Sequence, residues 1–555
     1  MATSGIRISA GLGWLSVAGI VLTLAGCLEP APFEDPPNIL LVVTDDQRWD
    51  TLSAMPRMAA ALGPRGVRFD NAFVTNPVCC PFRSSLLAGG FYSHETGVLT
   101  ATPANGAAPR FDDRRTLGTL LQEQGYRTGL IGKYLNRYDL IAPRVPPGWD
   151  FFFASQEPHD WYRTPWIRGS SGPRHATVGE AYVSERHITR VERSQALAFL
   201  GVDDPRPFFL MVATHAPHRP AIAPQKDRRL YRDFEYRDRA WGEEDLSDKP
   251  DYVRRRQGFF EREQTLGGRL VDLPQRQLAS LQLVDRLVVG LLGALEAAGE
   301  SDRTVVIFTS DNGMLWGEHR LYTKAMPYEE AIRVPLLIRA PGSLSRVVES
   351  LVAVDLDVAA TVLDFAGVRF DGRGHSLRPW LMGDHGVDRS EILLEGFGVD
   401  PDVTPAWTAV RTADWKLVEY ATGERELYDL RTDPFEENSR HREPAQQAHI
   451  ADLTSRLEGF RGLAIADSVY LPPAQVGASF EYRFSARGGS GSRHWQRIAG
   501  SVPPGLAVAP DGSLAGVPRR AGDFRFTLEV EDASTSPVTG KPQSHRRQFH
   551  LSVSP

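Results

Sequence analysis

Two adjacent cysteines, Cys79 and Cys80, precede Pro81 and Arg83 in this chain. Proline suits the first turn of an α-helix, where its missing N–H has no cost. We therefore expect Cys79 at a helix N-terminus, where backbone N–H groups and the helix dipole favour an anion. The pattern by itself leaves open a purely structural role, as a buried cysteine pair beside a helix start.

Four apolar runs, at residues 39–43, 128–131, 208–212 and 305–308, each end in polar side chains. Such runs are typical of strands buried on both faces of a parallel sheet, and open α/β sheets build ligand sites at the carboxyl ends of these strands. Each polar cluster alone could be a helix cap or a turn, but four together favour a shared site. The polar residues are Asp45, Asp46, Lys133, His215, His218, Asp311 and Asn312.

These side chains have the chemistry needed to hydrolyse an anionic ester. The carboxylates and the Asn312 amide offer hard oxygen ligands, which suit Ca²⁺ or Mg²⁺ and not zinc. A divalent ion together with Arg83, Lys133 and Lys324 would attract the anionic group and stabilise it electrostatically. His218 could donate a proton to the departing alcohol as a general acid.

The elements that must position these groups are those of an α/β protein. Apolar residues recur at helical spacing between 273 and 298, which predicts a packing helix ahead of the strand that ends at Asp311. Residues 333–338 and 352–363 continue the α/β pattern. After Asp384, short strands separated by turn residues predict an antiparallel subdomain, closed by a helix at residues 441–462.

The composition is that of a globular protein. The 555 residues allow three or four domains or one large α/β unit, and 42% of them are hydrophobic and 24% charged. A net charge of -6 argues against general nucleic-acid binding. Three cysteines are too few for a disulfide scaffold.

The N-terminus has the features of a secretory signal. Arg7 precedes an apolar run at residues 8–24 and the small residues before Cys27. Leu24-Ala25-Gly26-Cys27 resembles a bacterial lipobox, which implies cleavage before Cys27 and lipid attached to its sulfur. Residues 1–27 then form the leader and 28–37 a proline-rich, acidic tether, and we expect an exported lipoprotein anchored to a membrane of the cell envelope. An uncleaved signal anchor is the alternative.

The pattern Cys79-x-Pro81-x-Arg83, with a small residue, a leucine and a glycine after it, resembles the signature of the type I sulfatases. The resemblance extends over residues 36–460. It implies an alkaline-phosphatase-like fold, with a large mixed sheet flanked by helices at 38–384 and a small antiparallel subdomain at 385–465. It also implies that a maturation enzyme oxidises Cys79 to formylglycine, the nucleophile.

The same resemblance implies a metal site and a mechanism. Ca²⁺, with Mg²⁺ as the alternative, would be held by Asp45, Asp46, residue 79, Asp311 and Asn312. Hydrated formylglycine would attack sulfur through one hydroxyl while His218 or Lys324 protonates the leaving oxygen. The second hydroxyl would then expel sulfate. Arg83 and Lys133 complete the expected catalytic set.

One position departs from the family pattern. Many sulfatases read Gly-Lys-Trp-His where this chain has Leu135 in place of the histidine, which leaves the base for sulfate expulsion open. The Gly-Lys-Tyr-Leu-Asn form and the double cysteine resemble the branch of N-acetylglucosamine-6-sulfatases and heparan endosulfatases, which implies a sulfated glycan substrate. The candidate bases are His94, Asn136, His215 and His319.

Two further segments have their own patterns. Residues 228–262 are dense in charges of both signs, which is typical of a solvated, salt-bridged helical surface; the alternative is an arginine-bearing loop that grips a polyanionic glycan. Residues 468–555 consist of short alternating strands and Gly/Pro turns, which predict a small β-sandwich. Motifs such as Pro503-Pro504-Gly505-Leu506 resemble bacterial immunoglobulin-like repeats.

Two other classes of function remain open. One is a phosphodiester or phosphonate ester hydrolase, because some members of the alkaline phosphatase superfamily share the formylglycine signature. The other is a non-catalytic surface-binding lipoprotein, which the tether and the sandwich would suit.

Overall fold

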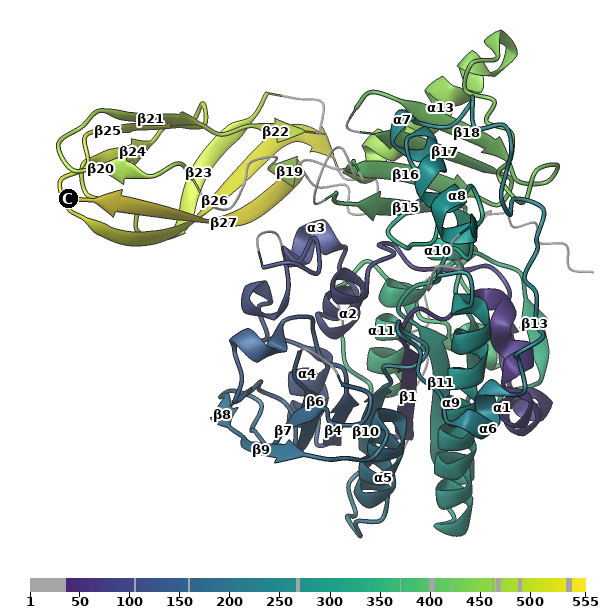
Figure 1. Cartoon of the computed structure of the whole chain (residues 1–555). Coiled ribbons are helices and arrows are strands. Elements are labelled where there is room, and N and C mark those ends of the chain that lie inside the picture. Colours follow the sequence, from purple (N-terminus) through teal and green to yellow (C-terminus); the bar gives the residue numbers. More distant parts are fainter. Residues whose placement is uncertain are drawn as a thin grey trace, which may run out of the picture.

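The computed structural model describes residues 36–103, 106–157, 160–265, 270–369, 371–398, 405–420, 422–461, 464–465, 471–487, 492–535 and 542–555. The predicted leader, with Cys27, and residues 28–35 of the predicted tether lie outside the described residues. The described chain forms a large α/β part, a small antiparallel sheet and a C-terminal β module (Figure 1).

A ten-stranded mixed sheet forms the centre of the α/β part. Its strands are β1 (Asn38–Thr44), β2 (Val67–Phe69), β4 (Arg127–Gly132), β6 (Phe151–Ser155), β7 (Pro165–Gly169), β9 (Glu180–Val183), β10 (Phe208–Ala213), β11 (Thr304–Ser310), β12 (Leu336–Arg339) and β13 (Arg346–Val348). Their order is β13-β2-β12-β11-β1-β10-β4-β6-β7-β9. The pairs from β11 to β6 are parallel, whereas β11/β12, β12/β2, β6/β7 and β7/β9 are antiparallel.

The four apolar runs of the sequence are β1, β4, β10 and β11, and they are neighbours in the order β11-β1-β10-β4. They are in parallel register, with Val43 opposite both Ala213 and Thr309 near the carboxyl ends. The polar residues that follow these strands therefore meet at one edge of the sheet, as predicted.

Helices cover both faces of the sheet. They are α1 (Pro56–Leu62), α5 (Ile188–Leu200) and α9 (Leu273–Ala297) on one face, and α2 (Cys79–Leu87), α4 (Leu117–Glu123) and α11 (Val354–Phe365) on the other. Leu40 and Val42 of β1 join the core of the first face, whereas Ile39, Leu41 and Val43 join that of the second. Because successive strand side chains point to opposite faces, a strand covered on both sides is apolar throughout.

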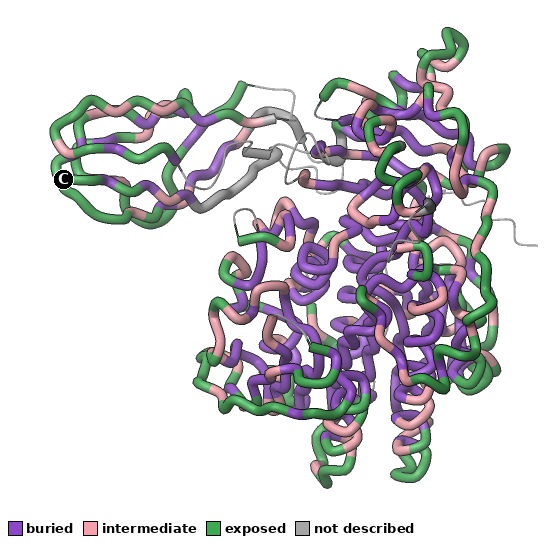
Figure 2. Tube along the Cα trace, viewed as in Figure 1, coloured by how far each residue is buried: buried purple, intermediate pink, exposed green. Residues whose placement is uncertain are grey.

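The predicted packing helix at 273–298 is confirmed as α9. Its length and apolar composition would suffice to cross a membrane, but 72% of its most apolar 18-residue window is buried inside the protein. It is a core helix, and Figure 2 shows the buried residues concentrated around the sheet and its covering helices.

Shorter elements connect these layers. The helices are α3 (Ser93–Thr96), α6 (Gln225–Arg228), α7 (Asp251–Arg254), α8 (Gln257–Thr265), α10 (Glu329–Ile332) and α12 (Arg378–Leu381). Two-stranded pairs form between β3 (Ala72–Phe73) and β14 (Val352–Ala353), and between β5 (Arg144–Val145) and β8 (Thr177–Val178).

The antiparallel sheet predicted after Asp384 is confirmed. It consists of β15 (Glu391–Gly396), β16 (Trp407–Thr412), β17 (Trp415–Tyr420) and β18 (Arg425–Asp429) in sequence order. The helix α13 (Gln447–Arg461) follows, inside the predicted range of 441–462. Ile450 and Leu453 of this helix share a core with Leu417 and Val418 of β17.

The C-terminal module has two sheets around a core of its own. One is β20 (Ala474–Gln475), β27 (Pro542–Ser554), β26 (Gly522–Thr535) and β23 (His494–Gly500), and the other is β21 (Phe480–Arg483), β25 (Ser513–Gly516) and β24 (Leu506–Val508). A short pair, β19 (Ala464–Ile465) and β22 (Ala486–Arg487), joins the module to the chain before it. The two-sheet arrangement agrees with the predicted β module, and its kinship to immunoglobulin-like repeats stays a prediction.

Candidate active site

Cys79 is the first residue of α2, and all nine residues of this helix are buried. Val78 before it is extended, and no side chain caps the helix. The N-terminus therefore keeps the positive potential of its backbone N–H groups beside the thiol. The predicted helix start at Cys79 is confirmed.

Buried acids surround this thiol. The ligand atoms of Asp45, Cys79 and Asp311 lie within 4.8 Å of one another, and so do those of Asp45, Asp46 and His218. Asp45 Oδ1 is buried and has no hydrogen-bond partner in the described part of the chain. Because buried polar atoms are normally hydrogen-bonded, a carboxylate oxygen without a hydrogen bond among other carboxylates fits a hard divalent cation.

Asn312 closes the cluster from the end of β11. Its Nδ2 donates to Asp46 Oδ1 at 2.7 Å. The backbone N–H of Asp46 donates to Asp311 Oδ1 at 3.2 Å, and Asp46 has a φ of 66°. This left-handed conformation is uncommon outside glycine and costs energy, and it turns the chain after β1 towards the end of β11.

Arg83 and Lys133 hold the acids from the side of α2 and β4. Arg83 is fully buried, and its Nε and Nη1 donate to Asp311 Oδ2 and to the Lys133 carbonyl, both at 2.9 Å. Lys133 Nζ donates to Asp45 Oδ2 at 2.5 Å. Both cations thus lie inside the cluster, as predicted, and an anionic group entering it would meet them.

Lys324 connects the acids to the thiol. Its Nζ lies 3.4 Å from Cys79 Sγ and 3.4 Å from Asn312 Oδ1, and it forms an ion pair with Asp46. Although burial favours the neutral amine, the charges of Asp46 and of a Cys79 thiolate raise the pKa of Lys324 well above its ordinary value. Lys324 is therefore a cation next to residue 79, and its N–H groups can donate hydrogen bonds there.

The acids differ in their proton affinity. Burial alone would raise the pKa of Asp45, but the charges of Lys133 and His218 hold it well below its usual range. Burial and the negative charge of Asp45 raise the pKa of Asp311 to about 6. Such repulsion between crowded carboxylates is what a bound divalent cation offsets.

His218 faces the same acids and reaches solvent. Its Nε2 lies 3.8 Å from Asp46 Oδ2, and its side chain is 33% exposed. Its Nδ1 lies 2.7 Å from the Arg219 carbonyl oxygen, which can only accept, so Nδ1 carries a proton and Nε2 faces the cluster. Burial lowers the pKa of His218, which makes the protonated ring a stronger acid.

His215 has other partners. Its Nδ1 lies 2.7 Å from Glu192 Oε1 on α5, and its Nε2 lies 2.8 Å from Ser155 Oγ at the end of β6. All three side chains are buried. These contacts fix the imidazole between the sheet and α5, close to the loop that carries His218. Glu192 and Ser155 carry no local sequence signal, so the sequence did not identify them.

His319 lies in a separate buried environment. Its Nδ1 lies 2.6 Å from Glu243 Oε2, and its ring stacks on Tyr328 with centroids 4.1 Å apart. Burial and the charge of Lys249 lower its pKa to about 3, so it is neutral at ordinary pH. Both contacts belong to the packing of the chain around His319 and Tyr328 against the segment that carries Glu243.

The other two candidate bases also have partners elsewhere. His94 Nδ1 lies 2.7 Å from Glu395 Oε2 on β15. Asn136 Nδ2 donates to Glu157 Oε1 at 3.0 Å. Each of the four candidate bases therefore has its own set of contacts. The structure brings the other predicted site residues together: Asp45, Asp46, Cys79, Arg83, Lys133, His218, Asp311, Asn312 and Lys324.

Leu135 and Cys80 belong to the hydrophobic core. Leu135 is 2% exposed and packs in the core of the α2 face, together with Cys80. Burial, and the charge that a Cys79 thiolate would carry, raise the pKa of Cys80 to about 12. Because thiol reactivity needs the thiolate, Cys80 is inert.

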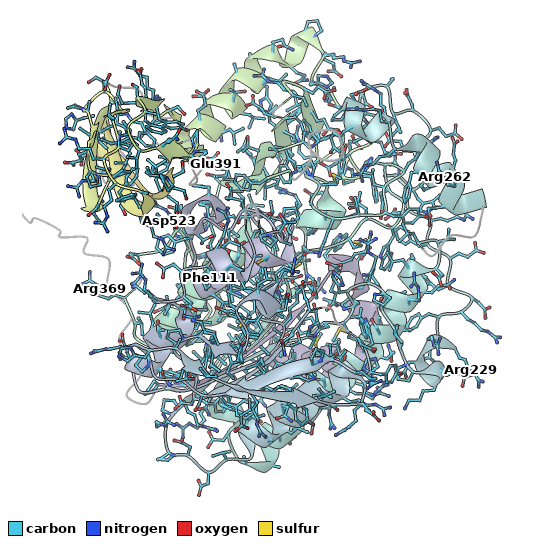
Figure 3. The ribbon with its side chains drawn as sticks, turned by 60° about the vertical axis from the view of Figure 1, so that its left-hand side comes forward. Phe111, Arg229, Arg262, Arg369, Glu391 and Asp523 are labelled. Atoms are coloured by element: carbon cyan, nitrogen blue, oxygen red, sulfur yellow. The ribbon has the colours of Figure 1, made fainter. Side chains whose placement is uncertain are left out.

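The charged segment at 228–262 is largely solvated. Arg232 pairs with Asp233 at 3.0 Å and Arg255 with Asp251 at 2.8 Å, all with exposed side chains. Figure 3 shows Arg229 and Arg262 at the outer surface of the molecule, pointing to solvent. These contacts agree with the interpretation as a solvated, salt-bridged surface, and the alternative of a loop that grips a glycan stays a prediction.

Comparisons with known proteins agree with this geometry. The chain matches the family model described as Sulfatase over residues 37–368, and the model described as N-sulphoglucosamine sulphohydrolase, C-terminal, over residues 317–462. It is 31% identical over 412 residues to the N-acetylglucosamine-6-sulfatase of Homo sapiens, which covers 70% of this chain and 73% of that protein.

Two further proteins resemble this chain over different shares of its length. The chain is 33% identical over 354 residues to a Sulf-1 homologue of Caenorhabditis elegans, which covers 60% of this chain but only 48% of the nematode protein. A solved structure of a protein in complex with its substrate D-glucosamine-2-N,6-O-disulfate has a TM-score of 0.66 and 25% identity. That likeness covers 77% of this chain and 98% of the solved one.

Proposed function

The chain belongs to the sulfatase family, with its alkaline-phosphatase-like fold, and we propose that it removes sulfate from a sulfated glycan of glucosamine or glycosaminoglycan type. The observation that carries the proposal is the position of Cys79, the first residue of α2, with Lys324 Nζ at 3.4 Å and buried acids around it. The substrate class is supported by the names of the human relative and of the sugar bound in the solved structure.

The nucleophile in this proposal is formylglycine at position 79, made from Cys79 by a maturation enzyme during export. Asp45, Asp46, Asp311 and Asn312 would hold a divalent cation together with residue 79, and Ca²⁺ suits this all-oxygen set, with Mg²⁺ as the alternative. When bound, the cation would supply Lewis-acid polarisation and charge neutralisation. Arg83 keeps Asp311 in place for this role through its hydrogen bond.

The chain's own side chains then bind the ester and move its protons. Lys133 and Lys324, both charged, would contact the sulfate oxygens at the end of the sheet. His218 Nε2, which faces the cluster from a partly open position, would protonate the leaving oxygen. Lys324 Nζ is the second donor within reach of residue 79.

The proposal extends to the location of the enzyme. Leu24-Ala25-Gly26-Cys27 supports a lipoprotein that is cleaved before Cys27 and anchored to the cell envelope by lipid, with residues 28–37 as the tether. The module at 468–555, for which the repeat-like Pro-Pro-Gly-Leu motif supports an immunoglobulin-like sandwich, would then project with the enzyme outside the cytoplasm.

One assay tests the function directly. Sulfate released from 6-O-sulfated N-acetylglucosamine and from heparin disaccharides is measured by ion chromatography, beside the hydrolysis of an aryl phosphodiester. We expect sulfate release from the sugars and much slower phosphodiester turnover. Faster phosphodiester turnover would assign the protein to the phosphoester hydrolases of its superfamily, and no turnover of either would favour a binding protein.

A further inference from the structure

A groove between the outer sides of α5 and α9 is lined by several arginines and is therefore positively charged. It has a volume of about 640 Å³. In the part of the chain that the structure describes, two of its arginines have carboxylate partners: Arg57 lies 3.5 Å from Asp285, and Arg286 lies 2.6 Å from Asp227. The arginines that line the groove are Arg57, Arg186, Arg190, Arg193 and Arg286.

The other three arginines have exposed side chains and form no ion pair with any described residue: Arg186, Arg190 and Arg193. Arg190 lies in the first turn of α5, where no acidic residue is present. The dipole of a helix disfavours cations at its N-terminus. The sequence thus places unpaired cations where the helix makes the potential more positive, which an anionic ligand would offset.

Gly290 has no side chain and so leaves the space in which the Arg193 guanidinium group lies. A Cβ atom at position 290 would lie 2.7 Å from both Nε and Nη2 of Arg193. Glycine inside a helix is destabilising compared with alanine, yet it stands here within α9. The guanidinium group therefore lies directly against α9 in space that a side chain at 290 would occupy.

Part of the lining of the groove is apolar. It consists of Leu197, Leu283 and Val289, which are buried or half-buried. Such side chains can contact the C–H face of a sugar ring, while the guanidinium groups of arginines pair with the oxygens of sulfate and carboxylate groups. An anionic membrane would instead meet protruding apolar and basic side chains, and this site is concave.

We propose that this arginine groove is an accessory site that binds a sulfated stretch of the glycan, apart from the catalytic centre. It lies on the outer side of α5, whereas Glu192 on the inner side contacts His215. The inference rests on the proposed function, because a polymeric substrate has sulfates to occupy both sites. A chain held in the groove has a raised effective concentration at the active site, so the groove lowers KM for long chains and not for monosaccharides.

The test is the affinity of the mature chain for a size-fractionated heparin oligosaccharide, measured by calorimetry in 0.15 M salt. We expect R190A/R193A to bind at least about tenfold more weakly, because it loses two charge-assisted contacts. The matched control R65A/R303A removes two exposed arginines that pair with Asp302 and Glu300, and its affinity stays at the wild-type value. Equal affinity of R190A/R193A and wild type would overturn the proposal.

A second variant guards against a folding defect. Gly290→Ala favours the α9 helix but displaces the Arg193 guanidinium, so we expect weaker heparin binding by a protein at least as stable as wild type. Tight binding of unsulfated heparosan, or stronger binding to anionic phospholipid vesicles than to heparin, would also contradict the accessory glycan site. Turnover of a small aryl sulfate is unchanged in both variants. If wild type does not hydrolyse the aryl sulfate, the proposed function is refuted, whereas the heparin affinities still test the groove as a binding site.

Discussion

Cys79 and Cys80 are adjacent in the chain but have opposite surroundings. Cys79 lies at the start of α2 with Lys324 Nζ 3.4 Å from its sulfur. Cys80 packs in the apolar core, and burial raises its pKa to about 12. At the residue scale, Cys79 is therefore the sulfur of the pair that lies at the cluster of acids and cations, whereas Cys80 is part of the core.

The carboxylates next to Cys79 should account for metal binding. We expect Asp311→Ala to lose the bound cation and to lower kcat by at least about 100-fold, because the cluster loses a central ligand and Arg83 its partner. Metal content by atomic emission and sulfate release check both effects on one sample. Asp302→Ala, at a position where the side chain is 84% exposed, is the control. Full activity of Asp311→Ala, or wild-type activity after chelation, would contradict the metal site.

At the element scale, α5 separates two surfaces. Its inner side carries Glu192, whose carboxylate lies 2.7 Å from His215 Nδ1 behind the catalytic loop. Its outer side carries Arg190 and Arg193, which line the arginine groove. One helix thus both positions the loop that carries His218 and presents charge to solvent.

The buried carboxyl group of Glu192 should make stability depend on pH. Burial raises its pKa to about 8, so the folded protein keeps a proton that the unfolded chain has lost. The contribution of Glu192 to stability is fully present below the ordinary carboxyl pKa, and it is lost as pH rises through the pKa that Glu192 has in the folded state. We expect the Tm of wild type to fall relative to that of Glu192→Gln between about pH 5 and pH 8. Parallel Tm profiles would contradict this, and Glu235→Gln, 80% exposed, is the control.

The elements of the site were predictable because they depend on local pattern. Apolar runs identified β1, β4, β10 and β11, and Pro81 identified the start of α2. The partners of the histidines were not predictable, because contacts such as His94 with Glu395 join positions 301 residues apart. The arginine groove likewise depends on the packing of α5 against α9, which no local pattern indicates.

At the scale of the whole molecule, the α/β part that carries the active site and the C-terminal module have separate hydrophobic cores. The residues of the site lie at strand ends and helix starts of the α/β part, and both family matches end by residue 462. The module has its own core, including Trp495, Phe526 and Phe549. In Figure 1 the module extends to one side of the small antiparallel sheet.

Separate cores predict that catalysis survives loss of the module. A chain that ends at residue 462 should hydrolyse an aryl sulfate with a kcat within about twofold of the full chain, since domains with their own cores fold independently. Circular dichroism and metal content establish that the shortened enzyme is folded and loaded. A folded, metal-loaded but inactive enzyme would show that the module contributes to the site.

The central claim is that residue 79 is the modified nucleophile of a sulfatase. Mass spectrometry of the tryptic peptide of residues 69–83 tests it most directly, on protein produced together with a maturation enzyme. We predict an aldehyde at position 79 in proportion to sulfatase activity, with Cys80 still a thiol and Cys79→Ala inactive. A free thiol at position 79 throughout a fully active preparation would contradict the account.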